Sequence, residues 1–169
     1  MTFHKRLVSQ MKGECDIGLL LYHTKYHMEY IKIIRAFGIL NRTFLSYISK
    51  SLTDKDLSYS DSIFLVNIGD KEGITQEEIA NSLAIDKAAI ARSVKNMEKK
   101  GYIRTEQSKA DKRAKELYLS DSGKKLYQFM QQINSQWINQ VMGDLDSDDM
   151  KTFSQTIEQI SERAKYFSK

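Results

Sequence analysis

The sequence of 169 residues contains no proline and only 8 glycines, so long helices can run without interruption. Its one cysteine, Cys15, excludes an internal disulfide framework and is typical of a cytoplasmic protein. No apolar run approaches the roughly 18 residues of a membrane span, and no small-residue cleavage site follows the N-terminal apolar stretch. We therefore expect a cytoplasmic protein without a signal peptide or membrane contact.

Enzyme motifs are also missing. The sequence has no Gly-rich phosphate loop, HExxH, CxxC or nucleophile elbow, so we expect no enzymatic activity and no cofactor. His23 and His27 are four residues apart and would share a helical face, with His4 or Cys15 as further ligands. Two histidines are a weak metal signal, and we predict no metal site.

Positive charge is concentrated in one segment. Ten cations and four anions lie between Lys87 and Glu116, a net charge of +6 over 30 residues in a chain whose total is +4. The other 139 residues therefore carry a net charge of −2. A solvated helix face would not need this concentration, whereas a nucleic-acid footprint would. The charge pattern favours DNA binding.

Apolar steps of three and four residues predict a long helix from Tyr30 to Leu52, and Ser58 is a predicted N-cap for the next helix. Thr75 and Glu78 form a predicted capping box for a short third helix. Asp86 would cap a fourth helix that stops before Gly101. Two short helices joined by a tight turn predict a helix-turn-helix.

After Gly101, apolar residues alternate with polar ones instead of recurring at steps of three and four. Two alternating segments flank the basic loop SKADKRA and predict a β-hairpin. Two apolar-striped helices follow, and their stripes, with that of the helix over 30–52, would be buried in a homodimer. We thus predict a mainly α fold with a small hairpin wing: an N-terminal extension over 1–29, a dimerisation helix over 30–52, a winged helix-turn-helix over 53–122 and C-terminal dimerisation helices over 123–169.

Three segments in order carry a family resemblance: TQEEIANSLAID, MEKKGYI and DKRAKELYLSDSGKKL. The part of the chain from Tyr30 to Phe167 resembles the MarR family of winged helix-turn-helix transcriptional regulators. The resemblance implies a homodimer that binds double-stranded DNA, usually as a repressor, and that a small molecule, metal or oxidant releases. In this family the N- and C-terminal helices make the dimer.

At 100° per residue, Val94 and Met97 lie within about 40° of Ile90 and would form the buried floor of the fourth helix. Arg92 lies on the opposite side, where it can bind guanine O6 and N7, while the lysines there contact phosphates. Many family members carry Ser or Thr at positions 88, 89 and 91, where this sequence has alanine. We therefore expect more dependence on phosphates, wing and DNA shape than on base contacts.

The resemblance places Arg113 in the minor groove, with Asp111 accepting a hydrogen bond from Arg113 or a neighbouring amide, or simply forming the turn. Thr75 and Gln76 lie at a helix N-terminus and are candidates for phosphate contact, although capping is the safer role for Thr75. The predicted DNA-binding residues are Thr75, Gln76, Lys87, Ala88, Ala91, Arg92, Lys95, Lys99, Lys109, Asp111, Lys112, Arg113 and Lys115.

Two kinds of sensor remain open. A small-molecule effector would bind among Arg35, Phe37, Arg42, Phe44, Tyr47 and Phe64, although aromatic residues at helical spacing are usually core. Cys15 would make a redox sensor only with a lowered pKa and access to solvent, and a passive role is favoured.

We predict a cytoplasmic, sequence-specific regulator that binds a pseudo-palindromic operator, represses, and is released by a small-molecule or stress signal. The alternatives are a winged-helix protein-interaction module without DNA binding and a redox-sensing regulator that uses Cys15.

Overall fold

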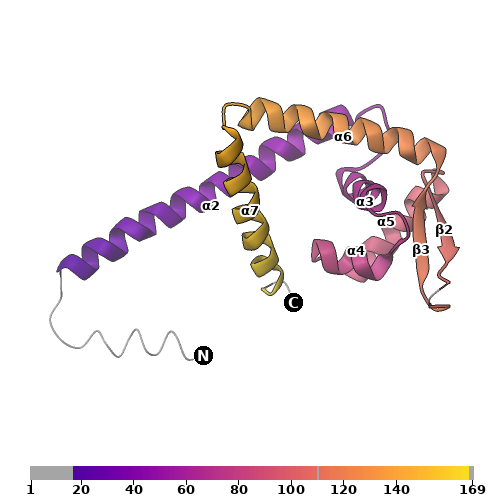
Figure 1. Cartoon of the computed structure of the whole chain (residues 1–169), viewed down its shortest axis with the longest axis horizontal. Coiled ribbons are helices and arrows are strands. Elements are labelled where there is room, and N and C mark those ends of the chain that lie inside the picture. Colours follow the sequence, from indigo (N-terminus) through magenta and orange to yellow (C-terminus); the bar gives the residue numbers. More distant parts are fainter. Residues whose placement is uncertain (1–16, 110, 168–169) are drawn as a thin grey trace. The chain divides into compact units, whose positions relative to one another are not determined.

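The computed structural model describes residues 17–109 and 111–167, and the side chains from residue 29 onward (Figure 1). The elements in chain order are α2 (Ile17–Ser51), α3 (Tyr59–Asp70), β1 (Ile74–Thr75), α4 (Gln76–Leu83), α5 (Lys87–Lys99), β2 (Ile103–Gln107), β3 (Lys115–Leu119), α6 (Asp121–Met142) and α7 (Ser147–Lys165). The chain divides into two compact units, Met1–Phe44 and Leu45–Lys169. Each unit is described separately.

The first unit consists, in its described part, of α2 up to Phe44. The helix begins at Ile17, so the stripe predicted from Tyr30 onward lies inside a longer helix. A sequence without proline permits this uninterrupted length of 35 residues. Ile33 is 48% exposed and Ile34 is 69% exposed, so much of the apolar stripe is exposed within this unit.

In the second unit, α3 begins where the sequence predicts. The Ser58 side chain accepts a hydrogen bond from Asp61 N at 3.0 Å, which confirms the predicted cap. Phe64, Leu65 and Ile68 place α3 in the core. The whole core of this unit comprises Ile48, Leu52, Leu57, Phe64, Leu65, Ile68, Ile74, Ile79, Ala80, Ile90, Val94, Met97, Ile103, Leu117, Leu119, Leu126, Met130 and Ile133.

The sheet has three strands in the order β1-β3-β2. The predicted hairpin is present as β2 and β3, which pair antiparallel with Thr105 opposite Leu117. The strand β1 was not predicted, because two residues are too few to show alternation. It pairs antiparallel with β3, with Ile74 opposite Leu117, and so ties the start of α4 to the hairpin. The predicted class, a mainly α winged helix-turn-helix, is confirmed.

The buried residues of α6 lie between Gly123 and Ile133. Leu126, Met130 and Ile133 belong to the core, whereas Val141, at the far end of the same stripe, is 50% exposed. The helix α7 begins at Ser147 and is capped by Asp146, whose Oδ1 accepts hydrogen bonds from Asp148 N and Asp149 N. None of its residues is buried, so its predicted apolar stripe is at least partly exposed within the second unit. Across the described residues, no helix combines the length and apolar character needed to cross a membrane.

Candidate nucleic-acid interface

The helix α5 separates an apolar face from a basic one. Ile90 and Met97 are fully buried and Val94 is 3% exposed, which confirms the predicted floor. The exposed side carries Ala88, Ala91, Arg92, Lys95 and Lys99. Three of these five side chains are cationic, and the two alanines let another surface approach the backbone. This face is therefore suited to a polyanion.

The N-terminal end of α5 is held in place by Asp86, whose Oδ1 accepts a hydrogen bond from Ala89 N at 2.9 Å. Just before it, Ala84 adopts a left-handed conformation with φ 52°, which turns the chain between the two helices. Lys87 follows the cap, and its Nζ lies 2.7 Å from Glu77 Oε1. Because the Lys87 side chain is 72% exposed, solvent screens this ion pair and it can exchange for a phosphate.

Thr75 and Gln76 lie at the start of α4. Thr75 Oγ1 accepts a hydrogen bond from Glu78 N at 3.2 Å, and Thr75 N donates to Glu78 Oε2 at 2.8 Å, which confirms the predicted capping box. Hydrogen bonds from Lys71 Nζ, from the Thr75 amide and from the Thr75 hydroxyl lower the pKa of Glu78 to about 2. The Thr75 hydroxyl thus belongs to the cap. A phosphate contact by Thr75 or by the half-buried Gln76 stays a prediction.

Hydrogen bonds from main-chain amides shape the tip of the hairpin. Asp111 Oδ1 accepts from Arg113 N at 2.8 Å, and the carbonyl oxygen of Asp111 accepts from Ala114 N at 2.9 Å. Ser108 N donates to the carbonyl of Ala114 at 3.1 Å and closes the loop. The Asp111 carboxylate therefore forms the turn that presents the exposed Arg113 side chain.

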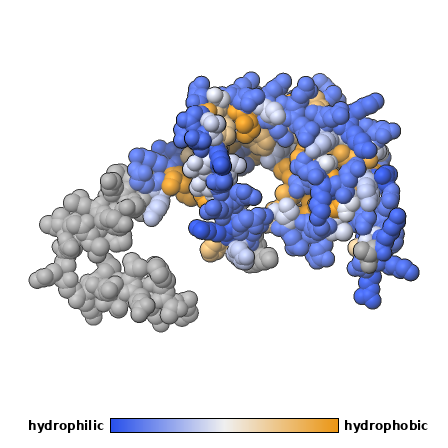
Figure 2. Space-filling view, in the orientation of Figure 1, coloured by the Kyte–Doolittle hydropathy of each residue, from blue (hydrophilic) through white to orange (hydrophobic). Residues whose placement is uncertain are grey.

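Exposed cations surround this turn. They are Lys109, Lys112, Arg113 and Lys115. Figure 2 shows hydrophilic side chains over the hairpin, in keeping with this list. The predicted wing is thus a positively charged tip on a short, hydrogen-bonded loop.

Sequence reasoning placed Arg104 in a strand of the hairpin but did not find its contact with Tyr118. The centre of its guanidinium group lies 4.6 Å from the centre of the Tyr118 ring, and it pairs with Glu106. The register that puts Arg104 opposite Tyr118 cannot be read from alternation alone. A hydrogen bond from Ser108 and another from Tyr118 lower the pKa of Glu116, and the bond to Glu116 raises the pKa of Tyr118. These contacts stiffen the stem that carries the tip.

The predicted effector residues are divided between the two units. The first unit contains Arg35, Phe37, Arg42 and Phe44, and the second contains Tyr47 and Phe64. Phe64 is 2% exposed in the core, and Tyr47 OH donates to Gln136 Oε1 at 3.4 Å. An effector site formed by these six residues stays a prediction.

The other sensor candidates lie mostly outside the described part of the structure. Cys15 is not among the described residues, and His23 and His27 are described only as backbone within α2. Within the described residues, no group of three or more His, Cys, Asp or Glu side chains is placed to hold a metal ion.

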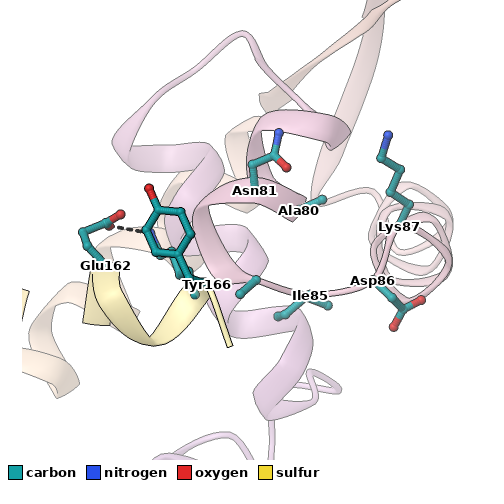
Figure 3. Close-up of a pocket in the computed structure, with 9 residues that line it drawn as sticks. Ala80, Asn81, Ile85, Asp86, Lys87, Glu162 and Tyr166 are labelled. Carbon is teal, nitrogen blue, oxygen red and sulfur yellow. Dashed lines mark hydrogen bonds and ion pairs between the residues drawn. The ribbon is translucent and has the colours of Figure 1, made fainter. Parts of the chain in front are cut away.

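A cavity of about 430 Å³ lies beside the start of α5 (Figure 3). Ile85 lines it from the turn between α4 and α5, and Glu162 and Tyr166 line it from the end of α7. It also reaches Asp86 and Lys87, so a molecule bound there would adjoin the N-terminus of α5. None of the six predicted effector residues lines this cavity.

Comparison with known protein families gives a match for the middle of the chain. Residues 55–114 match the family model described as "MarR family". The match runs from the segment before α3 to the tip of the hairpin, so it contains both helices of the helix-turn-helix and β2 of the wing.

Individual proteins match a longer part of the chain than the family model does. The "Uncharacterized HTH-type transcriptional regulator YybA" of Bacillus subtilis (strain 168) is 26% identical over 128 residues, which cover 76% of this chain and 85% of that protein. The crystal structure of a MarR transcriptional regulator from Methanosarcina mazei Go1 is 26% identical, with a TM-score of 0.69, and the match covers 78% of this chain and 95% of that chain. A MarR-family regulator from Listeria monocytogenes, crystallised with 26mer DNA, shares the fold at 24% identity and a TM-score of 0.75, covering 80% of this chain and 90% of that chain.

Proposed function

We propose that this chain is a transcriptional regulator of the MarR family that binds a specific operator in double-stranded DNA. The observation that carries the proposal is the exposed basic face of α5 above a fully apolar floor. In a helix-turn-helix, the N-terminal part of the second helix contacts base edges in the major groove. The relative from Listeria monocytogenes was crystallised with DNA, which supports the same use of this fold.

Arg92 is the proposed base reader on α5. Its guanidinium can donate two hydrogen bonds to guanine O6 and N7, which discriminates between bases by about 1–3 kcal/mol. Lys95 and Lys99 contact phosphates, which position the helix without reading sequence. Ala88 and Ala91 permit close approach and can touch thymine methyl groups.

The hairpin supplies the second proposed anchor. Arg113 enters the minor groove, where narrow A·T-rich segments attract arginine. Lys109, Lys112 and Lys115 contact the flanking phosphates, as Lys87 does beside the major groove. Indirect readout of DNA shape thus compensates for the few polar readers on α5.

We infer a homodimer from the uncovered apolar stripes. On α2, the stripe includes Ile33 and Ile34, and on α7 it includes Phe153 and Ile160, which are 41% and 43% exposed. Helices with one apolar stripe are stable when that stripe is buried, and a second copy of the same chain offers a self-complementary surface. A two-fold dimer would recognise a pseudo-palindrome with half-sites about one helical turn apart.

We further propose that the protein acts in the cytoplasm as a repressor that a small-molecule or stress signal releases. The cavity beside Asp86 and Lys87 supports the small-molecule form, because an occupant would compete with DNA at the start of α5. Oxidation of Cys15 is the alternative signal.

Selection of bound fragments from a random DNA library, followed by titration of the selected duplex at two salt concentrations, tests the proposal. We expect affinity to fall steeply as salt rises, because phosphate contacts release counterions. A winged-helix module that binds only proteins would enrich no fragment and would show no salt-dependent DNA binding.

A further inference from the structure

A buried carboxylate links α3 to the proposed DNA-reading helix. Asp61 is only 5% exposed, and its Oδ2 accepts a hydrogen bond from Asn96 Nδ2 on α5 at 2.9 Å. The two residues are 35 positions apart in the chain. A buried carboxylate needs such a partner, and a hydrogen bond to a charged acceptor is stronger than one between neutral groups. The contact is therefore directional and costly to lose.

A second tie lies one turn further along α5. Lys100 Nζ lies 3.2 Å from Asp56 Oδ1 and also donates to the carbonyl oxygen of Asp56. The Lys100 side chain is only 21% exposed, so its stem packs against protein. Tyr102 OH donates to the carbonyl of Lys55 at 3.1 Å. The C-terminal end of α5 is thus bound to the segment over 55–61 by three side chains.

The contacts of Asn96 and Lys100 lie on the same side of α5 as the proposed base reader, Arg92. Arg92, Asn96 and Lys100 follow one another at steps of four residues, so they lie along one side of the helix. Asn96 is half-buried against Asp61, whereas Arg92 is exposed. Because the helix is rigid, fixing Asn96 and Lys100 in place also fixes the side of α5 from which Arg92 extends.

We propose that Asn96, through Asp61, and Lys100, through Asp56, are positioning residues that set the rotation of α5 about its axis and so aim Arg92 at a base edge. The inference rests on the proposed function and makes it more specific. It concerns sequence discrimination, and it assigns no DNA contact to Asn96.

The apolar floor fixes which face of α5 points inward, but hydrophobic contacts are not directional, so small rolls of the helix are resisted more sharply by a hydrogen bond. For a helix about 10–12 Å across with its side chains, a roll of about 20° moves side-chain ends by about 2 Å. A displacement of that size breaks a hydrogen bond to a base edge. Phosphate contacts by flexible lysines tolerate it, so affinity for random DNA would change little.

Two variants and a control test the proposal by the ratio of affinities for the selected operator and for random duplex. Asn96→Ala removes the donor, and because a cavity of about 470 Å³ adjoins both residues, water can reach Asp61 and the fold is kept. The double variant Asp61→Asn with Asn96→Asp exchanges the two groups, restores the hydrogen bond and leaves the net charge unchanged. Asn139→Ala, on an exposed part of α6, is the matched control.

We expect Asn96→Ala to lower the ratio by about tenfold, the scale of one bidentate base contact. The exchanged pair should return it to within about threefold of the wild-type ratio, and Asn139→Ala should not change it. A folded Asn96→Ala protein with the wild-type ratio, or an exchanged pair that folds without restoring the ratio, would overturn the positioning role. A wild-type protein that binds no duplex would instead overturn the proposed function, and this inference with it.

Discussion

Gly123, in the first turn of α6, lies directly against the main-chain carbonyl oxygen of Tyr102. A Cβ atom at position 123 would come within 2.0 Å of that oxygen. The same carbonyl accepts a hydrogen bond from Ser120 N at 3.0 Å, so neither side can withdraw without breaking the join between the hairpin and α6. This close approach explains the glycine of the segment DSGKKL in the sequence.

Gly123→Ala should therefore destabilise the protein by about 1–3 kcal/mol, since the clash is with backbone rather than with a flexible side chain. Chemical denaturation followed by circular dichroism measures the loss. Gly38→Ala is the control, because its Cβ would meet only the end of the Arg42 side chain, at 3.1 Å. That change should be neutral or stabilise the helix by about 0.5–1 kcal/mol. Equal stability of the two variants would contradict the assigned role of Gly123.

Arg113→Ala should weaken operator binding by about 1–3 kcal/mol and leave dimerisation intact, because the side chain is exposed at the hairpin tip. Fluorescence anisotropy with the selected duplex measures the affinity, and sedimentation gives the oligomeric state. Lys151→Ala removes an exposed cation from α7 and should have little effect. Unchanged affinity of the Arg113 variant would count against a wing contact.

Arg92→Ala and Lys99→Ala should have different effects on DNA binding. Loss of Arg92 should relax base preference at one position of each half-site, whereas loss of Lys99 should weaken all sequences alike and reduce the salt slope by about 1. Titration of single-base operator variants at several salt concentrations separates the two effects. If Lys99 rather than Arg92 controlled base preference, the roles assigned along α5 would be wrong.

Stability should fall in acid through Glu78. Its folded pKa of about 2 lies below the ordinary value of 4.5, so the charged form contributes stability above pH 4.5 that is lost as pH falls toward 2. Because the side chain is 45% exposed, solvent screening limits the contribution to about 1 kcal/mol or less. Glu78→Gln should reduce the difference in unfolding free energy between pH 7 and pH 3, and Glu158→Gln should not. Equal acid sensitivity of both variants would exclude the Glu78 contribution.

Phe153→Glu should convert the proposed dimer into a monomer at micromolar concentration, since it buries a charge within the apolar stripe of α7. Analytical ultracentrifugation detects the change. Gln155→Glu adds the same charge at an exposed polar position of the same helix and should leave the dimer intact. A Phe153→Glu protein that still sediments as a dimer would place the interface elsewhere.

Local chemistry in the sequence predicted several of these features correctly. The caps at Ser58 and Asp86 and the box of Thr75 with Glu78 need only residues three apart in the chain. The buried floor of α5 follows from helical periodicity, and the two long strands follow from alternation.

Other features depended on partners distant in the chain. The strand β1 exists only because β3 pairs with it, and Arg104 meets Tyr118 only through the strand register. No local pattern in the sequence distinguishes Asn96 from other helix residues, and only the packing of α3 against α5 brings Asp61 to it.

The sequence by itself therefore determined the order of the helices and of the two hairpin strands, the caps at Ser58, Thr75 and Asp86, and the basic face of α5, because these depend on periodicity and on neighbours within one turn. Tertiary structure alone decided which side chains of α3 contact α5, where the cavities lie and which apolar stripes stay exposed within each unit. Those outcomes depend on packing between segments tens of residues apart, and no local pattern encodes the geometry of such contacts.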